Sequence, residues 1–295
     1  MRHVRLMQAI DKVARMGSIR RAAEAIAISP SALNRQILTV EEDVGAELFE
    51  RLPRGVRLST AGEIYLRCFR AHLAELDRAA SQVADLSGLR AGAIRLGVTE
   101  ELADHFAPSV AAAYQAQYPM VDIAMRVTPM DQLGPALRAF DIDIGLAVNC
   151  LQDETVETIH AETVEVVCIA SSTSDLPDPI ALSDLAGRPL FAPSAGSGLR
   201  NAVDALLSFR NIPRRYALET DRLAPGMLRA NPVAAQFAIG VNIEPKQMAD
   251  QGLSMHVLPS TAPLATVSLL GLRYRALPVS SAKLASEFAK ALSSG

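Results

Sequence analysis

Residues 17–37 read GSIRRAAEAIAISPSALNRQI and hold two short helical patterns separated by only three residues. Ser18 is placed to cap the first helix, whose alanines recur at helical spacing. Ser29 supplies a second capping oxygen, and Pro30 fits the first helical position, where its missing N–H costs nothing. The stretch therefore predicts two helices, the second of which begins at Pro30.

The second pattern has two faces. Its apolar positions fall at i, i+4 and i+7 and are expected to be buried: Leu33, Ile37 and Val40. The opposite face carries Ser31, Asn34, Arg35 and Leu38. Two helices joined this closely have the outline of a helix-turn-helix, whose second helix enters the DNA major groove. Spacing alone leaves an ordinary helical hairpin equally open.

The segment that follows, LFERLPRGVRLSTAGEIYL (residues 48–66), changes the balance between these alternatives. Pro53 and Gly55 favour a turn between two short strands, with three arginines near its tip: Arg51, Arg54 and Arg57. Such a wing beside a recognition helix can follow the phosphate backbone or place an arginine in a minor groove. A solvated hairpin is the alternative, and the three arginines make it the weaker one.

A long helix is expected from Ser59 or Thr60 to about Ser87, with Glu63 placed as in a capping box. Apolar residues recur along it in steps of three and four, as in a coiled-coil seam: Leu66, Phe69, Leu73, Leu76, Ala80 and Val83. A seam without a partner would be exposed to water. We therefore expect the chain to form a dimer through this helix.

Three segments carry a resemblance to a known family: AAEAIAISPSALNRQI (22–37), VEEDVGAELFER (40–51) and GVRLSTAGE (55–63). Residues 1 to about 88 resemble the N-terminal half of LysR-type transcriptional regulators. The resemblance implies a winged helix-turn-helix DNA-binding domain (1–60), a linker helix for dimerisation (61–90) and an effector-binding domain (91–295). It also implies partners: double-stranded promoter or operator DNA, a small-molecule effector, further copies in a homodimer or homotetramer, and RNA polymerase.

From Ala91 onward, short apolar strands alternate with helical patterns, which predicts βαβ units and a parallel sheet. The stretch resembles the family's two-lobed effector domain, which is similar to a periplasmic binding protein. We assign the first lobe to residues 91–163 and 269–295, and the second to 164–268. The fold class is therefore α/β, with a ligand cleft expected between the lobes, beyond the carboxyl ends of the strands.

Polar residues at these strand ends are the candidates for effector binding. Thr99 and Glu100 follow the first strand, Thr128 the second and Asn149 the third. Family effector sites use positions after the first and second strands, although Glu100 would be an unusual neighbour for an anion.

In the other lobe, PSAGSGLRNAV (193–203) is the most informative stretch, with Ser194 and Ser197 as candidates. Its glycines let backbone N–H groups approach an anion at a helix N-terminus, which favours a carboxylate effector. Ser197 is equally well explained as the cap of its own helix. Thr220, which ends YALET, is a weaker candidate because it also fits an ordinary strand residue.

Composition and motifs argue against other classes of function. The net charge of −3 gives no general affinity for nucleic acid, and residues 1–90 hold only a modest basic excess. The sequence contains no dinucleotide-binding fingerprint, no phosphate-binding loop and no GxSxG nucleophile elbow. The histidines form no metal-spaced cluster: His3, His72, His105, His160 and His256. We therefore expect no catalytic residue, metal or cofactor.

The three cysteines, Cys68, Cys150 and Cys168, are widely spaced, as fits a reducing cytoplasm. The N-terminus is expected to be an amphipathic helix rather than a signal peptide, and no apolar run reaches membrane-spanning length. The alternative function is a small-molecule-binding or redox-sensing protein with a vestigial DNA-binding domain, in which Cys150 would be the reactive thiol.

Overall fold

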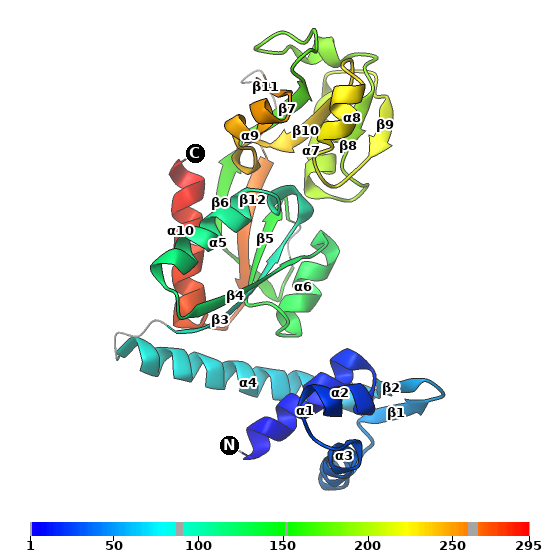
Figure 1. The fold of residues 1–295 in the computed structure, drawn as a ribbon, viewed down its shortest axis with the longest axis vertical. Helices are drawn as coiled ribbons and strands as arrows, with labels where there is room; N and C mark the ends of the chain where they lie inside the picture. The colour runs from blue at the N-terminus through cyan, green and yellow to red at the C-terminus, as the bar shows by residue number, and fades with distance from the viewer. Residues whose placement is uncertain (1, 87–90, 151–152, 259–264, 295) are drawn as a thin grey trace. The chain divides into compact units, whose positions relative to one another are not determined.

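A computed structural model describes residues 2–86, 91–150, 153–258 and 265–294. The chain divides into two compact units, Met1–Val83 and Ala84–Gly295. Each unit is described by itself below (Figure 1).

The first unit begins with three helices, α1 (Arg2–Met16), α2 (Ile19–Ala25) and α3 (Pro30–Val44). The hydroxyl of Ser18 caps α2, because it accepts a hydrogen bond from the backbone N–H of Arg21 at 3.3 Å. That of Ser29 caps α3 by accepting from the N–H of Ala32 at 3.2 Å, with Pro30 at the first helical position. Both predicted caps and the break between the helices are confirmed.

The three helices share one small apolar core, which holds the buried face predicted for the second helix of the pair. Leu33 and Ile37 are buried, and Val40 packs against the same cluster. The strands β1 (Phe49–Leu52) and β2 (Gly55–Leu58) pair antiparallel and form the expected wing. The helix α4 (Thr60–Leu86) follows, and Ser59 caps it by accepting a hydrogen bond from the N–H of Gly62 at 3.0 Å.

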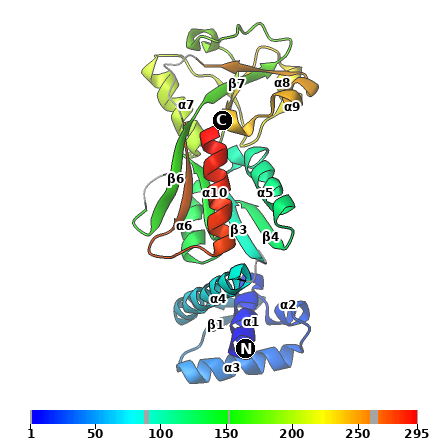
Figure 2. The same cartoon turned by 90° about the vertical axis from the view of Figure 1, so that its left-hand side faces the viewer.

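The second unit holds two five-stranded sheets, one in each lobe. The first sheet has the order β4-β3-β5-β12-β6. Its strands are β3 (Gly92–Val98), β4 (Val121–Val127), β5 (Ile144–Val148), β6 (Val156–Val164) and β12 (Ala265–Leu272). The helices α5 (Phe106–Gln117) and α10 (Val279–Ser294) cover one face, and α6 (Met130–Arg138) covers the other (Figure 2).

The second sheet has the order β11-β7-β10-β8-β9. Its strands are β7 (Val166–Ser171), β8 (Leu190–Ala192), β9 (Tyr216–Glu219), β10 (Ala235–Ile239) and β11 (Leu253–Val257). The helix α7 (Gly198–Phe209) packs on one face, and α8 (Pro225–Ala230) with α9 (Pro245–Asp250) packs on the other. The chain crosses between the sheets at Glu165, the single residue between β6 and β7.

Two expectations about this unit need correction. The sheets are mixed rather than parallel, because strands that arrive from the other lobe run the opposite way: β12 is antiparallel to β5, and β7 is antiparallel to β10. The boundary expected at residue 269 also lies too late. The strand β12 already pairs with β6 from Ala265 onward, so residues 265–268 belong to the first lobe.

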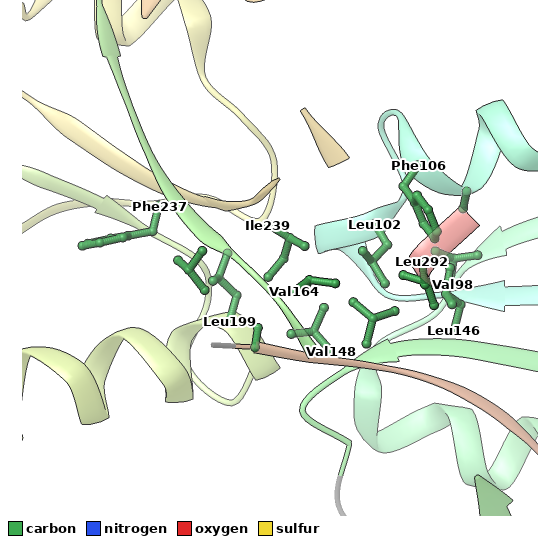
Figure 3. Close-up of a cluster of buried hydrophobic side chains, with 14 of the residues drawn as sticks. Val98, Leu102, Phe106, Leu146, Val148, Val164, Leu199, Phe237, Ile239 and Leu292 are labelled. Carbon is green, nitrogen blue, oxygen red and sulfur yellow. The ribbon is translucent and has the colours of Figure 1, made fainter. Parts of the chain in front are cut away.

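One continuous apolar core joins the two lobes. Figure 3 shows Val148 and Val164 of the first lobe near Leu199 and Ile239 of the second. Phe237 lies at one end of this cluster and Phe106 at the other. The lobes are therefore held together by packed side chains as well as by the strands that cross between them.

Candidate functional site

The exposed face of α3 lies at the N-terminal half of that helix. Ser31 and Arg35 are exposed, whereas Asn34 is half-buried. Gln36 and Thr39 are exposed beside them, and the Thr39 hydroxyl donates to the carbonyl of Arg35 at 3.0 Å. The face is small and polar, as a helix that enters a DNA groove requires. Gln36 and Thr39 were not among the predicted contacts, although i, i+4 spacing from Ala32 and Arg35 identifies them.

The wing is fixed to the helices by a close backbone approach. Gly55 has a φ of +119°, and a Cβ atom there would lie 2.3 Å from the carbonyl oxygen of Gly17. The next residue, Val56, donates its N–H to that same oxygen at 3.0 Å. At the other end of β1, Glu41 of α3 accepts hydrogen bonds from the N–H groups of Leu48 and Phe49. The wing and α3 therefore hold a fixed geometry.

The three wing arginines differ in their surroundings. Arg51 donates from Nη2 to the side-chain oxygen of Asn34 at 2.9 Å, which joins the wing to α3. Arg57 pairs with Glu50 across the two strands at 2.8 Å, so its charge is already balanced. Arg54, at the tip, is exposed, and its side chain makes no hydrogen bond or ion pair among the described residues. A hydrogen bond thus joins two of the six predicted DNA contacts, Asn34 and Arg51, and two more, Ser31 and Arg35, lie together on the exposed face of α3.

The residues of the predicted apolar seam along the linker helix α4 fall into two groups, one buried and one exposed. Leu66 is buried in the core of the first unit, and Phe69 packs against the same core. Leu76 and Val83 are 49% and 64% exposed. The expectation that the whole stretch faces a partner is therefore wrong at its N-terminal end, because Leu66 and Phe69 close the domain's own core.

The second unit contains a cleft of about 490 Å³ that both lobes line. The first lobe contributes Glu100 and Glu101 from the short helix η1 (Glu100–Leu102), followed by Asp104 and His105. The second lobe contributes a loop after β9 and residues around the end of β10. These are chiefly Thr220, Asp221, Arg222, Leu223, Gln236, Asn242, Ile243, Gln247 and Met248.

The structure separates the seven predicted effector residues. Glu100 and Thr220 line this cleft. Thr99 and Thr128 are 2% and 9% exposed and lie outside its lining. The Thr99 hydroxyl has no hydrogen-bond partner among the described residues, whereas that of Thr128 donates to the carbonyl of Arg126 at 3.3 Å.

The other three predicted residues brace the protein itself. Asn149 donates to the carbonyl of Gly198 at 3.1 Å and accepts from the N–H of Thr266 at 2.8 Å. Ser194 donates both its N–H and its hydroxyl to Asp221, at 2.8 and 2.9 Å. Ser197 caps its own helix by accepting from the N–H of Arg200 at 3.1 Å. The alternative explanation of Ser197 as a cap agrees with the structure.

The N-terminus of α7 is already occupied by a carboxylate of the protein. Glu101 is 7% exposed, and its Oε1 accepts a hydrogen bond from the N–H of Leu199 at 3.3 Å. The same terminus lies against the first lobe so closely that a Cβ at Gly198 would come within 1.9 Å of the Val148 carbonyl oxygen. The expectation that this terminus binds an effector carboxylate therefore disagrees with the structure, because Glu101 fills that role.

At the N-terminus of α5 the lobes exchange roles, because a side chain of the second lobe caps a helix of the first. The side-chain oxygen of Asn242, in the second lobe, accepts from the N–H groups of His105 and Phe106 at 2.9 and 2.8 Å. These groups begin α5 in the first lobe. Arg222 of the second lobe also pairs with Asp104 of the first, with its Nε 2.9 Å from the carboxylate. Side chains of each lobe thus satisfy polar groups of the other.

The electrostatics of the cleft concentrate on Glu100. Burial, together with the negative charges of Asp221 and Glu101, raises the pKa of this carboxyl above its usual value, against an opposing hydrogen bond from its own backbone. Among the described residues, its side chain has no hydrogen bond or ion pair with any other residue, in contrast to the other carboxylates of the cleft.

Among the described residues, neither the cysteines nor the side chains that could bind a metal form a second site. Cys150 is half-buried, and burial raises the pKa of its thiol, which disfavours the reactive thiolate. Cys168 is fully buried, with its thiol pKa raised to about 12. Within the described ranges, no three His, Cys, Asp or Glu side chains gather as a metal site would require. None of the helices seen there combines the length and apolar character needed to cross a membrane.

The missed cleft residues have recognisable signals. Asp221 and Arg222 directly follow Thr220 at the end of β9, and so obey the same strand-end rule that singled out Thr220. Glu101 and Asp104 follow closely after the end of β3 at Val98, within or just beyond the short helix η1. What the sequence does not reveal is which carboxylate reaches across to the opposite lobe.

Comparison with known proteins agrees with this arrangement. Residues 4–63 match the family model of the bacterial regulatory helix-turn-helix protein, lysR family, and residues 87–228 match the LysR substrate binding domain. Full-length CbnR in complex with its target DNA has a TM-score of 0.69 at 17% identity, covering 98% of this chain and 99% of that one. Full-length OxyR from Pseudomonas aeruginosa also reaches 0.69, at 15% identity, with 98% and 94% covered.

Curated relatives include the transcriptional regulator CbbR from Rhodospirillum rubrum, 31% identical over 70% of this chain and 69% of that protein. CbbR from Sinorhizobium medicae is 32% identical over 70% and 67%. The wing, the recognition helix and the two lobes thus occur together in a chain whose two matched regions cover both units. The protein belongs to the LysR family of DNA-binding transcriptional regulators.

Proposed function

We propose that this regulator reads its operator with the exposed face of α3, holds the DNA backbone with its wing, and adjusts that binding to a small molecule taken up between its two α/β lobes. The observation that carries the DNA-binding part is the bond from Arg51 to Asn34, which fixes the wing against the reading helix. A fixed relation between these two elements supports simultaneous contact with base edges and phosphates.

The six DNA-binding residues have different roles in this proposal. Ser31, Asn34 and Arg35 lie near the start of α3, the part that reaches base edges in helix-turn-helix proteins. Asn34 reads a base edge with its amide, and Arg35 contacts a base or a phosphate. Arg51 positions Asn34, and Arg54 supplies positive charge beside the phosphates, whereas Arg57 contributes less because it pairs with Glu50.

The effector part rests on the cleft of about 490 Å³, a volume typical of small-molecule sites. Because both lobes line it, a ligand there contacts both and changes the relation between them. Glu100 and Thr220 line it, with Asp221 beside them; Thr99 and Thr128 lie at the neighbouring strand ends. This coupling makes the protein a ligand-responsive regulator rather than an enzyme.

Assembly follows from α4. The exposed Leu76 and Val83 form an apolar stripe that a second copy covers, which gives a homodimer on an operator with two related half-sites. Contacts between effector lobes extend the homodimer to a homotetramer, which acts on RNA polymerase at the promoter. All of these partners place its site of action in the cytoplasm.

A gel-shift titration tests the proposal. Full-length protein is titrated onto the DNA upstream of its own coding region and onto random DNA of equal length, with and without compounds that raise its thermal midpoint. We expect preferential binding of the upstream DNA and a changed affinity or mobility when the compound is present. Equal binding of both DNAs would contradict it.

A further inference from the structure

We propose that the cleft between the lobes takes a ligand with a positively charged group, an ammonium or guanidinium, which pairs with Glu100. This inference rests on the proposed function, because it names the chemical class of the effector for the same cleft. It replaces the carboxylate expected from the sequence.

The backbone N–H groups at the cleft that could bind an anion already donate hydrogen bonds to side chains of the protein. An anion binds most readily to free N–H groups at a helix N-terminus. Two such termini lie at the cleft, and the opposite lobe closes both: Glu101 accepts from the first turn of α7, and Asn242 accepts from the start of α5. A carboxylate ligand would have to displace these side chains and would meet the charge of Glu101.

The charges that line the cleft favour a cation. Four carboxylates line it, from Glu100, Glu101, Asp104 and Asp221. The guanidinium of Arg222 is held by Asp104, and His105 lies 3.7 Å from Glu244. Each basic group therefore already has a carboxylate of the protein beside it. Acidic groups outnumber basic ones in the lining, and an excess of one sign of charge attracts ligands of the opposite sign.

Glu100 is the carboxylate that lacks a partner. Asp221 accepts two hydrogen bonds from Ser194, Glu101 accepts one from Leu199, and Asp104 pairs with Arg222. Apart from a hydrogen bond from its own backbone, Glu100 has no such contact among the described residues, and it lies near the negative charges of Asp221 and Glu101. Burial is the main reason that its pKa is raised, and the negative charges of Asp221 and Glu101 add to the shift; a bound cation would relieve that repulsion.

The rest of the cleft suits the stem of such a ligand. Leu223, Ile243 and Met248 provide an apolar wall, and Gln247 adds an amide. A cation on a short apolar chain would place its charge at Glu100 and its stem against this wall. The volume of about 490 Å³ accommodates a ligand of the size of an amino acid or a small polyamine.

The test compares ligands with the same carbon chain but different end groups. Cadaverine, 1,5-pentanediol and glutarate share five carbons and carry ammonium, hydroxyl and carboxylate ends; lysine, agmatine and spermidine extend the cationic set. Each is added to the full-length protein, and the thermal midpoint and binding heat are measured. We expect at least one cationic compound to raise the midpoint, and glutarate and pentanediol to leave it unchanged.

Variants then locate the site. Glu100→Gln should weaken binding of the stabilising amine by about tenfold, since it removes a charged partner of similar size. Glu157→Gln, which removes an exposed carboxylate on β6, is the matched control and should bind as the wild type does. In the unchanged protein, amine affinity should also fall as the pH drops through the pKa of Glu100 and as salt rises.

The outcomes separate this inference from the proposed function. No stabilisation by any cationic compound, or full affinity in Glu100→Gln, overturns the cationic ligand. Binding of glutarate with a changed gel shift also overturns it, yet leaves a ligand-responsive regulator in place. Loss of preference for the upstream DNA over random DNA would contradict the proposed function, whichever ligand binds.

Discussion

The guanidinium of Arg51, in the wing, donates a hydrogen bond to the side-chain oxygen of Asn34, on the recognition helix, at 2.9 Å. This bond joins a residue suited to phosphates with one suited to base edges. It also holds the Asn34 oxygen in one orientation, so that the amide can reach a base edge with little loss of side-chain freedom. The two elements are therefore expected to act as one reading unit.

Replacing each of the three wing arginines by alanine should therefore change DNA binding in a different way. Arg51→Ala should lower both general DNA affinity and preference for the operator, because it also releases Asn34. Arg54→Ala should weaken binding to all sequences similarly and reduce the slope of log affinity against log salt by about 1. Arg57→Ala should have the smallest effect, because Glu50 already balances that charge. Fluorescence anisotropy over a salt series measures all three; equal effects would contradict this division.

The approach of α7 to the first lobe predicts a steric effect at Gly198. A methyl group there would lie 1.9 Å from the Val148 carbonyl oxygen, a backbone atom that cannot move aside cheaply. Gly198→Ala should therefore destabilise the effector domain by about 1–3 kcal/mol. Gly226→Ala is the control, since nothing lies within 4 Å of its added carbon. Urea denaturation measures both, and equal stability of the two variants would show that the lobes do not pack this closely.

The exposed half of α4 predicts where the dimer can be broken. Leu76→Glu combined with Val83→Glu should place like charges on the apolar stripe, split the dimer and lower operator affinity. The control is Gln82→Glu, which adds a charge at an exposed position beside the stripe. Sedimentation velocity separates the species. If the double variant sediments as the wild type does, the stripe is not the dimer contact.

Glu100 predicts a dependence of stability on pH. Its pKa is raised in the folded chain, so folding favours the protonated form, and the ionised form costs stability once the pH exceeds the unfolded value. Glu100→Gln, which is always neutral, should thus have a higher thermal midpoint than the wild type at neutral pH. The difference should vanish at acidic pH, where both side chains are uncharged. A lower midpoint for the variant at neutral pH would contradict the raised pKa.

Local signals in the sequence were sufficient for much of this fold. Ser18, Ser29 and Pro30 mark the helix boundaries because capping depends on neighbouring residues. The wing follows from the turn around Pro53 and Gly55. Contacts between distant residues were not predictable in this way. The apolar spacing of Leu66 and Phe69 is the same whether they face their own core or a partner.

The same holds for the cleft: features that depend on neighbouring residues were predictable, and contacts between distant residues were not. Strand ends located Glu100 and Thr220, because the position at which a strand ends along the chain follows from a local pattern. The N–H of Leu199 donates a hydrogen bond to Glu101, which lies 98 positions away in the sequence, and neither segment alone indicates this contact. The expectation of an anionic ligand rested on the glycines around Ser197, and the structure shows that the carboxylate of Glu101, from the other lobe, already accepts a hydrogen bond at that terminus.

The most direct test of the account is the effect of Asn34→Ala on sequence discrimination. Affinities of the wild type and the variant are measured for the operator, for operators changed one base pair at a time, and for random DNA. We expect the variant to lose about 1–3 kcal/mol of discrimination at one base pair while its affinity for random DNA is nearly unchanged. Equal losses on operator and random DNA would contradict a reading role for Asn34 and, with it, the proposed way in which this protein recognises its operator.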